Sequence, residues 1–131
     1  DKERYNKGLQ IRKEVLGGKY VNNAINNATD FNRGFQELTT EYCWGAVWGS
    51  DGLSRKQRSI LNLGILATQN RSKEFSLHFR AALKNGCSLE ELRDVLEQIT
   101  IYCGVPTGLE SFRLAKEIIN EIDDKKTEEN S

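Results

Sequence analysis

The stretch that decides the fold is residues 88–104, "SLEELRDVLEQITIYCG". Its apolar side chains recur every three or four residues, which is the period of an α-helix with one buried face. These positions are Leu89, Leu92, Val95, Leu96, Ile99, Tyr102 and Cys103. Ser88 and Glu91 have the spacing of a capping box, in which each side chain satisfies a free backbone amide at the start of a helix. The sequence therefore predicts a helix that begins after Ser88 and ends at Gly104.

The same period recurs along the chain, and no segment alternates with the period of two that marks a strand. We expect further helices over residues 3–16, 31–49, 55–70, 72–85 and 107–124. The expected starts are Asp30, the pair Ser54 and Gln57, Ser72, and the pair Thr107 and Glu110. The asparagine-rich stretch 19–28 suits a loop or a short turn. The prediction is an all-α, compact bundle of about six helices in a single domain, residues 1–124, followed by a disordered C-terminal tail, residues 125–131.

The expected helix over 31–49 has an apolar face formed by Phe31, Phe35, Leu38, Tyr42 and Ala46. The helix over 55–70 is apolar on nearly every side between residues 60 and 67, so we expect it to be central. Hydrophobic residues make up only 37% of the chain, which is lean for a self-contained globule. We infer that partner subunits complete part of the core, so that the protein is a homo-oligomer.

Composition excludes several classes of function. The chain has 131 residues with 19 basic and 19 acidic side chains, mixed along the sequence, so no charged field favours nucleic acid or anionic membranes. No apolar run approaches the length of a membrane span, and no signal peptide opens the chain. The three cysteines, Cys43, Cys87 and Cys103, have neither CxxC nor zinc spacing. We expect a cytoplasmic protein with reduced thiols and no metal site.

Glu41, Trp44 and Trp48 share one face of an α-helix because they lie at positions i, i+3 and i+7. A carboxylate between indoles loses hydration, which raises its pKa and suits it to proton transfer near neutral pH. The alternative is structural: both tryptophans lie at a subunit interface and Glu41 is paired nearby.

His78, the only histidine, lies on an apolar helix stripe together with Arg71 and Glu74. Three ionisable groups on one partly apolar face are costly to bury without a function. Arg58 and Asn62 project together from the otherwise apolar helix over 55–70, and an arginine there suits a carboxylate ligand. The alternatives are a packed core histidine and a structural ion pair.

Four motifs occur together in one order: "EYCWG" (41–45), "RSILNL" (58–63), "HFRAALKNG" (78–86) and "YCGVPTGLESFR" (102–113). In these motifs, and over about 115 residues, the chain resembles the gamma-carboxymuconolactone decarboxylases. The resemblance implies an all-helical homo-oligomer, a trimer or hexamer, that acts in aromatic compound catabolism without a metal or organic cofactor. The implied reaction converts 4-carboxymuconolactone, a small carboxylated lactone, to 3-oxoadipate enol-lactone in the protocatechuate branch of the beta-ketoadipate pathway.

The wider superfamily includes alkyl hydroperoxidase D-like peroxidases, which carry the pattern C-x-x-C-x-x-x-H and a glutamate. In this chain Arg71 and Glu74 occupy the two cysteine positions, and Ser59 occupies the position of the glutamate. Without two thiols there is no dithiol–disulfide cycle. The resemblance is therefore to the decarboxylase branch.

We assign site residues from this resemblance and from the helix faces. The catalytic candidates are His78, Glu41 and Arg58, and the substrate-binding candidates are Arg71, Trp44, Trp48, Glu74, Asn62 and Ser59. The arginines would bind carboxylates, the tryptophans would exclude water, and either His78 or Glu41 would supply the proton. Two alternatives stay open: a related enzyme for another small unsaturated acid or lactone, and a non-catalytic ligand-binding homologue.

Overall fold

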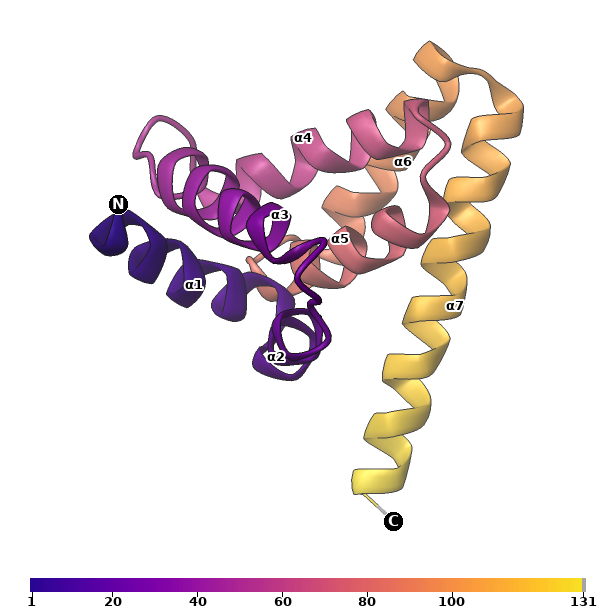
Figure 1. Ribbon diagram of the computed structural model, residues 1–131. Helices are drawn as coiled ribbons and strands as arrows, with labels where there is room; N and C mark the ends of the chain where they lie inside the picture. The colour runs from indigo at the N-terminus through magenta and orange to yellow at the C-terminus, as the bar shows by residue number, and fades with distance from the viewer. Residues whose placement is uncertain (131) are drawn as a thin grey trace. The chain divides into compact units, whose positions relative to one another are not determined.

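The computed structural model describes residues 1–130, and the predicted all-α class is confirmed because these residues form helices and no strand (Figure 1). The elements are α1 (Lys2–Leu16), α2 (Gly18–Asn26), α3 (Arg33–Leu38), the π-helix η1 (Thr39–Val47), α4 (Arg55–Thr68), α5 (Ser72–Lys84), α6 (Leu89–Cys103) and α7 (Val105–Glu129). They group into two compact units, unit 1 (residues 1–55) and unit 2 (residues 56 onward). The sequence did not predict this division, and we describe each unit by itself. Within residues 1–130 no helix has both the length and the apolar character that crossing a bilayer requires.

Most of the asparagine-rich stretch is helix α2, so the predicted loop or short turn is wrong. Gly17, with φ of 95°, separates α2 from α1, and the short helix buries Val21 completely. Asn22 and Asn23 face solvent. Burial of one apolar face therefore outweighs the weak helix propensity of asparagine, as tertiary packing often does.

The predicted α-helix over 31–49 is also different in the structure. It begins at Arg33, with Asn32 rather than Asp30 as the capping position, and α3 passes directly into η1 at Thr39. A π-helix bonds residues five apart along the chain and has a wider turn than an α-helix. The α-helical spacing used to place Glu41, Trp44 and Trp48 on one face therefore does not hold through η1.

Helix α1 packs directly against η1, and the closest approach is at a glycine. A Cβ atom at Gly8 would lie 2.0 Å from the carbonyl oxygen of Thr40 and 2.7 Å from the amide nitrogen of Gly45. Thr40 and Gly45 are five residues apart, the spacing of a π-helical hydrogen bond. The two backbones approach so closely at this point that unit 1 has no room for any side chain at Gly8.

The core of unit 2 is formed where α4, α5, α6 and α7 meet. Its buried members are Leu63, Ala67, Phe75, Phe79, Ala82, Cys87, Leu92, Leu96, Ile99, Leu114, Ala115 and Ile118. The Ser88–Glu91 capping box is present, as predicted. Helix α4 is central only on one side, because Leu61 and Ile65 are exposed.

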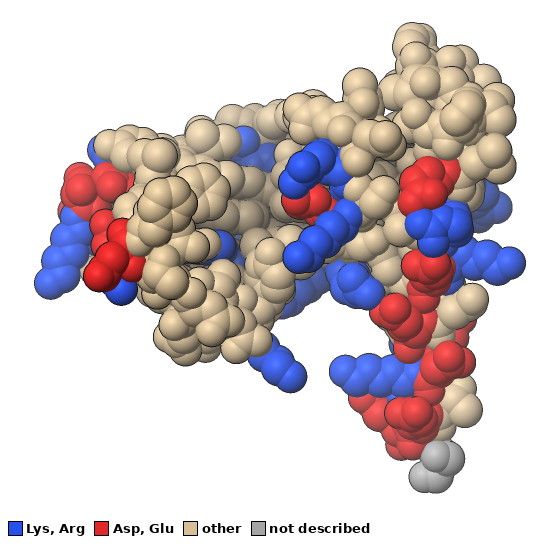
Figure 2. Space-filling view, turned by 45° about the vertical axis from the view of Figure 1, so that its right-hand side comes forward, with Lys and Arg blue, Asp and Glu red and all other residues tan. Residues whose placement is uncertain are grey.

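Helix α7 begins earlier and ends later than predicted. It starts at Val105, directly after Gly104 with φ of 102°, so Thr107 lies inside the helix rather than at its cap. It also continues through the predicted disordered tail as far as Glu129, while Ser131 lies outside the described residues. Acidic and basic side chains both lie along this end of α7 (Figure 2), and opposite charges three or four residues apart stabilise an exposed helix.

The apolar face predicted for residues 31–46 is exposed in the structure. Phe31 is 99% exposed, Phe35 64% and Leu38 56%. A second apolar surface lies at the α6–α7 corner, where Ile101 and Tyr102 are 80% and 83% exposed, and Figure 2 shows no charged side chain over this corner. Exposed apolar patches of this kind are typical of interaction surfaces.

The Gly8 contact gives a prediction for stability. Gly8→Ala should destabilise unit 1 by about 1–3 kcal/mol, the usual cost of overpacking, because the new methyl group meets backbone atoms that cannot rotate away. Gly34→Ala is the matched control: nothing lies within 4 Å of a Cβ atom there, so the alanine should stabilise α3 by up to about 1 kcal/mol. Thermal unfolding followed by circular dichroism measures both. Equal melting temperatures for the two variants would contradict the close approach.

Candidate active site

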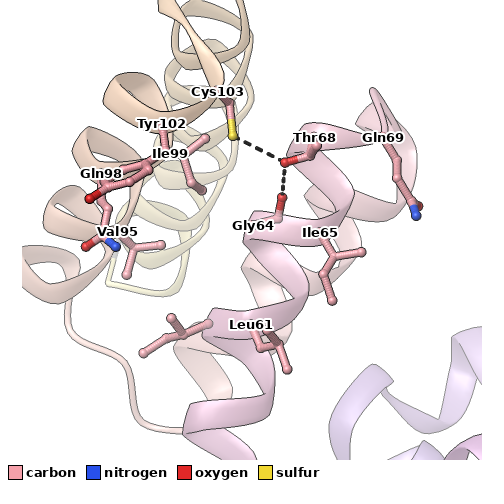
Figure 3. Close-up of a pocket in the computed structure, with 11 residues that line it drawn as sticks. Leu61, Gly64, Ile65, Thr68, Gln69, Val95, Gln98, Ile99, Tyr102 and Cys103 are labelled. Atoms are coloured by element: carbon pink, nitrogen blue, oxygen red, sulfur yellow. Dashed lines mark hydrogen bonds between the residues drawn. The ribbon is translucent and has the colours of Figure 1, made fainter.

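An apolar groove with a volume of about 540 Å³ lies between α4 and α6 in unit 2 (Figure 3). The residues that line it are Ile60, Leu61, Gly64, Ile65, Thr68, Gln69, Val95, Gln98, Ile99, Tyr102 and Cys103. The hydroxyl of Thr68 donates to the carbonyl oxygen of Gly64 at 2.8 Å, so the thiol of Cys103, 3.2 Å from that hydroxyl, is the donor in their contact. None of these side chains is charged. The groove therefore does not suit a dianionic ligand, and the predicted site residues lie outside it.

Two of the predicted residues meet in unit 2. Asn62 of α4 and His78 of α5 are both half-buried, and the Nδ2 atom of Asn62 lies 3.4 Å from Nδ1 of His78. An amide nitrogen is only a donor, so Nδ1 is the acceptor and the ring proton of the neutral imidazole lies on Nε2. The contact thus selects one tautomer of the only histidine.

Burial lowers the pKa of His78 below its usual range, and the nearby carboxylate of Glu74 opposes this effect without cancelling it. The imidazole is therefore predominantly neutral at pH 7, because the ordinary pKa of histidine is already about 6.5. A neutral imidazole with its proton on Nε2 is a hydrogen-bond donor. It is a poor proton source at this pH.

Arg71 and Glu74 form an ion pair at the start of α5. The Nη2 atom of Arg71 lies 2.5 Å from Oε1 of Glu74, and the arginine side chain is 60% exposed. The hydrogen bond from Arg71 is the main reason that the pKa of Glu74 is lowered. The predicted convergence of three ionisable groups is therefore a surface ion pair beside a half-buried histidine.

The two neighbouring α4 candidates differ in accessibility. Arg58 is half-buried and lies one helical turn before Asn62. Ser59 is completely buried, and its hydroxyl accepts a hydrogen bond of 2.9 Å from Nδ2 of Asn85. Ser59 thus links α4 to the end of α5, and this burial argues against direct contact with a substrate.

Glu41 lies in unit 1, and the expected rise in its pKa is wrong. Its Oε1 atom accepts from the amino group of Asp1 at 2.9 Å and from Nη1 of Arg4 at 3.0 Å. These hydrogen bonds, with that from Asp1 the larger, hold the pKa of Glu41 below its usual range. The carboxyl group is therefore ionised near neutral pH and cannot be a resident acid.

Trp44 lies within η1 and Trp48 at its C-terminal end, and both side chains are buried. Their ring centroids are 4.8 Å apart, and the ring planes are tilted by 31°. Together with Glu41 they belong to unit 1, whereas Arg58, Ser59, Asn62, Arg71, Glu74 and His78 belong to unit 2. Within each unit the structure brings together Trp44 with Trp48, Asn62 with His78, and Arg71 with Glu74.

Sequence reasoning missed one residue, Arg12 of α1. It is only 6% exposed, and its Nη1 atom donates to the side chains of Gln36 and Thr40. The signal was present in the sequence, because Gly8, Arg12 and Val15 are spaced four and three residues apart and so share the buried side of α1. An arginine on the buried side of a helix indicates a candidate functional residue as strongly as His78 does on α5.

Comparison of the sequence with known proteins gives one family and several relatives. Residues 33–117 match the Carboxymuconolactone decarboxylase family. A nitrosuccinic acid decarboxylase of Metarhizium robertsii is 44% identical over 92% of this chain and 85% of its own length. A 4-carboxymuconolactone decarboxylase of Acinetobacter baylyi is 35% identical over 93% of this chain and 91% of its own length. A shorter match, to a 4-carboxymuconolactone decarboxylase of Pseudomonas putida, is 40% identical over 34% of this chain and 94% of its own length.

The fold and the comparisons define an all-helical enzyme of the carboxy-lyase class. The chain belongs to the Carboxymuconolactone decarboxylase family, which confirms the resemblance found in the sequence.

The state of His78 can be measured directly, since a single histidine gives a single imidazole signal. In an NMR titration the pKa of His78 should lie below that of free histidine. Glu74→Gln should lower this pKa further, because it removes the carboxylate that favours the charged ring. Asp94→Asn, a change at an exposed position of α6, should leave it unchanged.

The lowered pKa of His78 also determines how this group changes the free energy of unfolding with pH. The folded state binds fewer protons than the unfolded chain, so this group makes the free energy of unfolding decrease as the pH falls below about 6.5. A pKa of His78 above the usual value would contradict the burial described here.

Proposed function

We propose that the chain catalyses the decarboxylation of 4-carboxymuconolactone to 3-oxoadipate enol-lactone in the beta-ketoadipate pathway. The observation that carries the proposal is the neutral, Nε2-protonated His78, held by Asn62 in a chain of the decarboxylase family. The substrate itself provides the electron sink for this reaction, and the following steps use only this chain's residues, the substrate and water.

In the proposed reaction the bond between the lactone ring carbon and its carboxylate breaks. The electron pair passes through the ring double bond into the lactone carbonyl, which gives a dienolate, and the carboxylate leaves as carbon dioxide. A proton then adds to the carbon next to the carbonyl. The net reaction consumes one proton for each carbon dioxide released.

The proposed role of His78 is to donate the Nε2 hydrogen to the oxygen on which negative charge develops. A preorganised donor at such an oxygen is typically worth about 3–4 kcal/mol. The lowered pKa values of His78 and Glu41 leave neither as a protonated acid at pH 7. We therefore assign the proton to solvent water, and the hydroxide left behind combines with carbon dioxide as bicarbonate.

The proposed carboxylate-binding residues in unit 2 are Arg58 and Arg71. Arg58 is half-buried near Asn62, which suits the fork of a guanidinium to a desolvated carboxylate. Arg71 must exchange its ion pair with Glu74 for the substrate, and this exchange costs little because exposed ion pairs are weak. From unit 1 we retain Trp44 and Trp48 as proposed apolar contacts and Glu41 as an ionised group.

A second candidate substrate is nitrosuccinate, favoured by the higher identity, 44%, to a nitrosuccinic acid decarboxylase. Both compounds are succinates that carry an electron sink on the carbon that loses carbon dioxide. The sink is the unsaturated lactone in one and the nitro group in the other. In both reactions the charge develops on a sink oxygen, so the same donor from His78 would serve either substrate.

We also propose that the enzyme works as a homo-oligomer, a trimer or hexamer. The support is the apolar surface left exposed at Phe31, Phe35 and Leu38, together with that at Ile101 and Tyr102. Burial of such surface between subunits would supply the apolar area that the lean composition lacks.

The test compares two substitutions of His78 in an ultraviolet assay of decarboxylation with each substrate. The amide nitrogen of glutamine falls near the position of Nε2, whereas that of asparagine falls near Nδ1. We expect His78→Asn to lower kcat by about 10²–10³-fold, as for loss of one oxyanion donor. His78→Gln should retain more activity than His78→Asn.

The ratio of kcat/KM values for the two substrates in the wild-type enzyme identifies the preferred one. Unchanged kcat in His78→Asn would disprove the role of the imidazole. Absence of carbon dioxide release from both substrates by wild type would disprove the proposed function, even if the chain still bound them.

A further inference from the structure

Arg12 is a buried cation in the interior of unit 1. Its side chain leaves α1 toward α3 and η1, and the residue is 6% exposed. The Nη1 atom lies 3.0 Å from Oε1 of Gln36 and 3.0 Å from Oγ1 of Thr40. Both acceptors are neutral, so the hydrogen bonds satisfy one nitrogen without compensating the positive charge.

The opposite edge of the guanidinium, formed by Nε and Nη2, has no partner. Nε is completely buried and makes no hydrogen bond. Among residues 1–130 no carboxylate pairs with Arg12, and Nη2 makes no hydrogen bond within this range, although it is not sealed from the surface. Nη2 is therefore the accessible nitrogen of this edge, and a charged N–H donor of this kind makes a strong hydrogen bond to a carboxylate oxygen.

The titratable groups whose charge affects Arg12 do not supply an anion. They are Tyr20, Cys43 and Tyr5, two phenols and a thiol, and none of them is a carboxylate. Burial raises the pKa of the Cys43 thiol further, despite the opposing effect of Arg12. Cys43 is therefore protonated at neutral pH and is not the missing counter-ion.

An unpaired buried charge is costly, and proteins retain one only where something compensates it. We propose that Arg12 binds one carboxylate of a dicarboxylic acid of the substrate's class through its Nη2 atom. The carboxylate enters from the Nη2 side, because Nε is covered. This inference rests on the proposed function for the identity of the ligand, but the carboxylate site itself can be tested without turnover.

The first test measures binding of succinate, a dicarboxylate without an electron sink, by isothermal titration calorimetry. Arg12→Met should weaken binding by about 10–100-fold, the usual value of a hydrogen-bonded charge contact. Arg12→Lys keeps the charge but loses the fork, so its affinity should lie between the two. Lys13→Met, which removes a neighbouring charge on α1, is the matched control and should bind as wild type does.

The second test needs no change at Arg12. In a Cys103→Ser background Cys43 is the only exposed thiol, since Cys87 is buried. A bound carboxylate cancels the influence of Arg12 that favours the thiolate, so succinate should slow the alkylation of Cys43 by iodoacetamide. Succinamide, which is neutral and similar in shape, should not. This test still shows whether a carboxylate binds at Arg12 if the Arg12→Met variant does not fold.

Three results would overturn the inference: no succinate binding by wild type, equal affinity in Arg12→Met, or alkylation of Cys43 that does not respond to succinate. A change of oligomer mass in Arg12→Met at unchanged affinity would also overturn it, by assigning the carboxylate to a second copy of the chain. Failure of the proposed function is distinguishable, because Arg12-dependent succinate binding without decarboxylation upholds the site alone. Decarboxylation with the same kcat/KM in Arg12→Met refutes only the site.

Discussion

The close packing of α1 on η1 is the constraint on which unit 1 depends. At Gly8 the backbone of α1 meets the carbonyl of Thr40 and the amide of Gly45 with no space for a Cβ atom. The contact holds α1 against the wide turn of a π-helix, a geometry that recurs at functional sites. It also fixes what lies beside it: Arg12 reaches Thr40, and Arg4 reaches Glu41. Both arginine contacts thus lie between α1 and η1, beside the close approach at Gly8.

In unit 2 the packing determines the position and the charge state of one imidazole, that of His78. Phe75 and Phe79 of α5 are almost completely buried, and His78 sits on the same helix at the edge of this core. Partial burial keeps the ring neutral, and Asn62 determines which nitrogen carries the proton. These two effects give a fixed hydrogen-bond donor of the kind that stabilises an oxyanion, which is the need of a substrate with its own electron sink.

The helical class, the core face of α6 and the family could all be predicted, because apolar period, capping residues and motif order are local properties of the sequence. Helix α2 could not be predicted, since its asparagines favour a turn and only the burial of Val21 reverses that preference. The π-helix and the ionised state of Glu41 were missed for a related reason. The π-helix packs on Gly8, and Glu41 is paired with the amino group of Asp1 and with Arg4, so in both cases the partners are remote in sequence. His78 and Asn62 were each identified as candidates, but their contact joins two helices and cannot be derived from either alone.

The most direct test of the central claim, a neutral His78 at the reacting centre, is the pH dependence of kcat/KM for decarboxylation. This ratio reports the pKa values of the free enzyme. If the neutral imidazole is the working form, kcat/KM decreases on the acid side at the lowered pKa of His78, stays level above it, and loses this limb in His78→Asn. An increase in kcat/KM as His78 becomes protonated would show that the imidazolium acts as the acid, and would contradict the account.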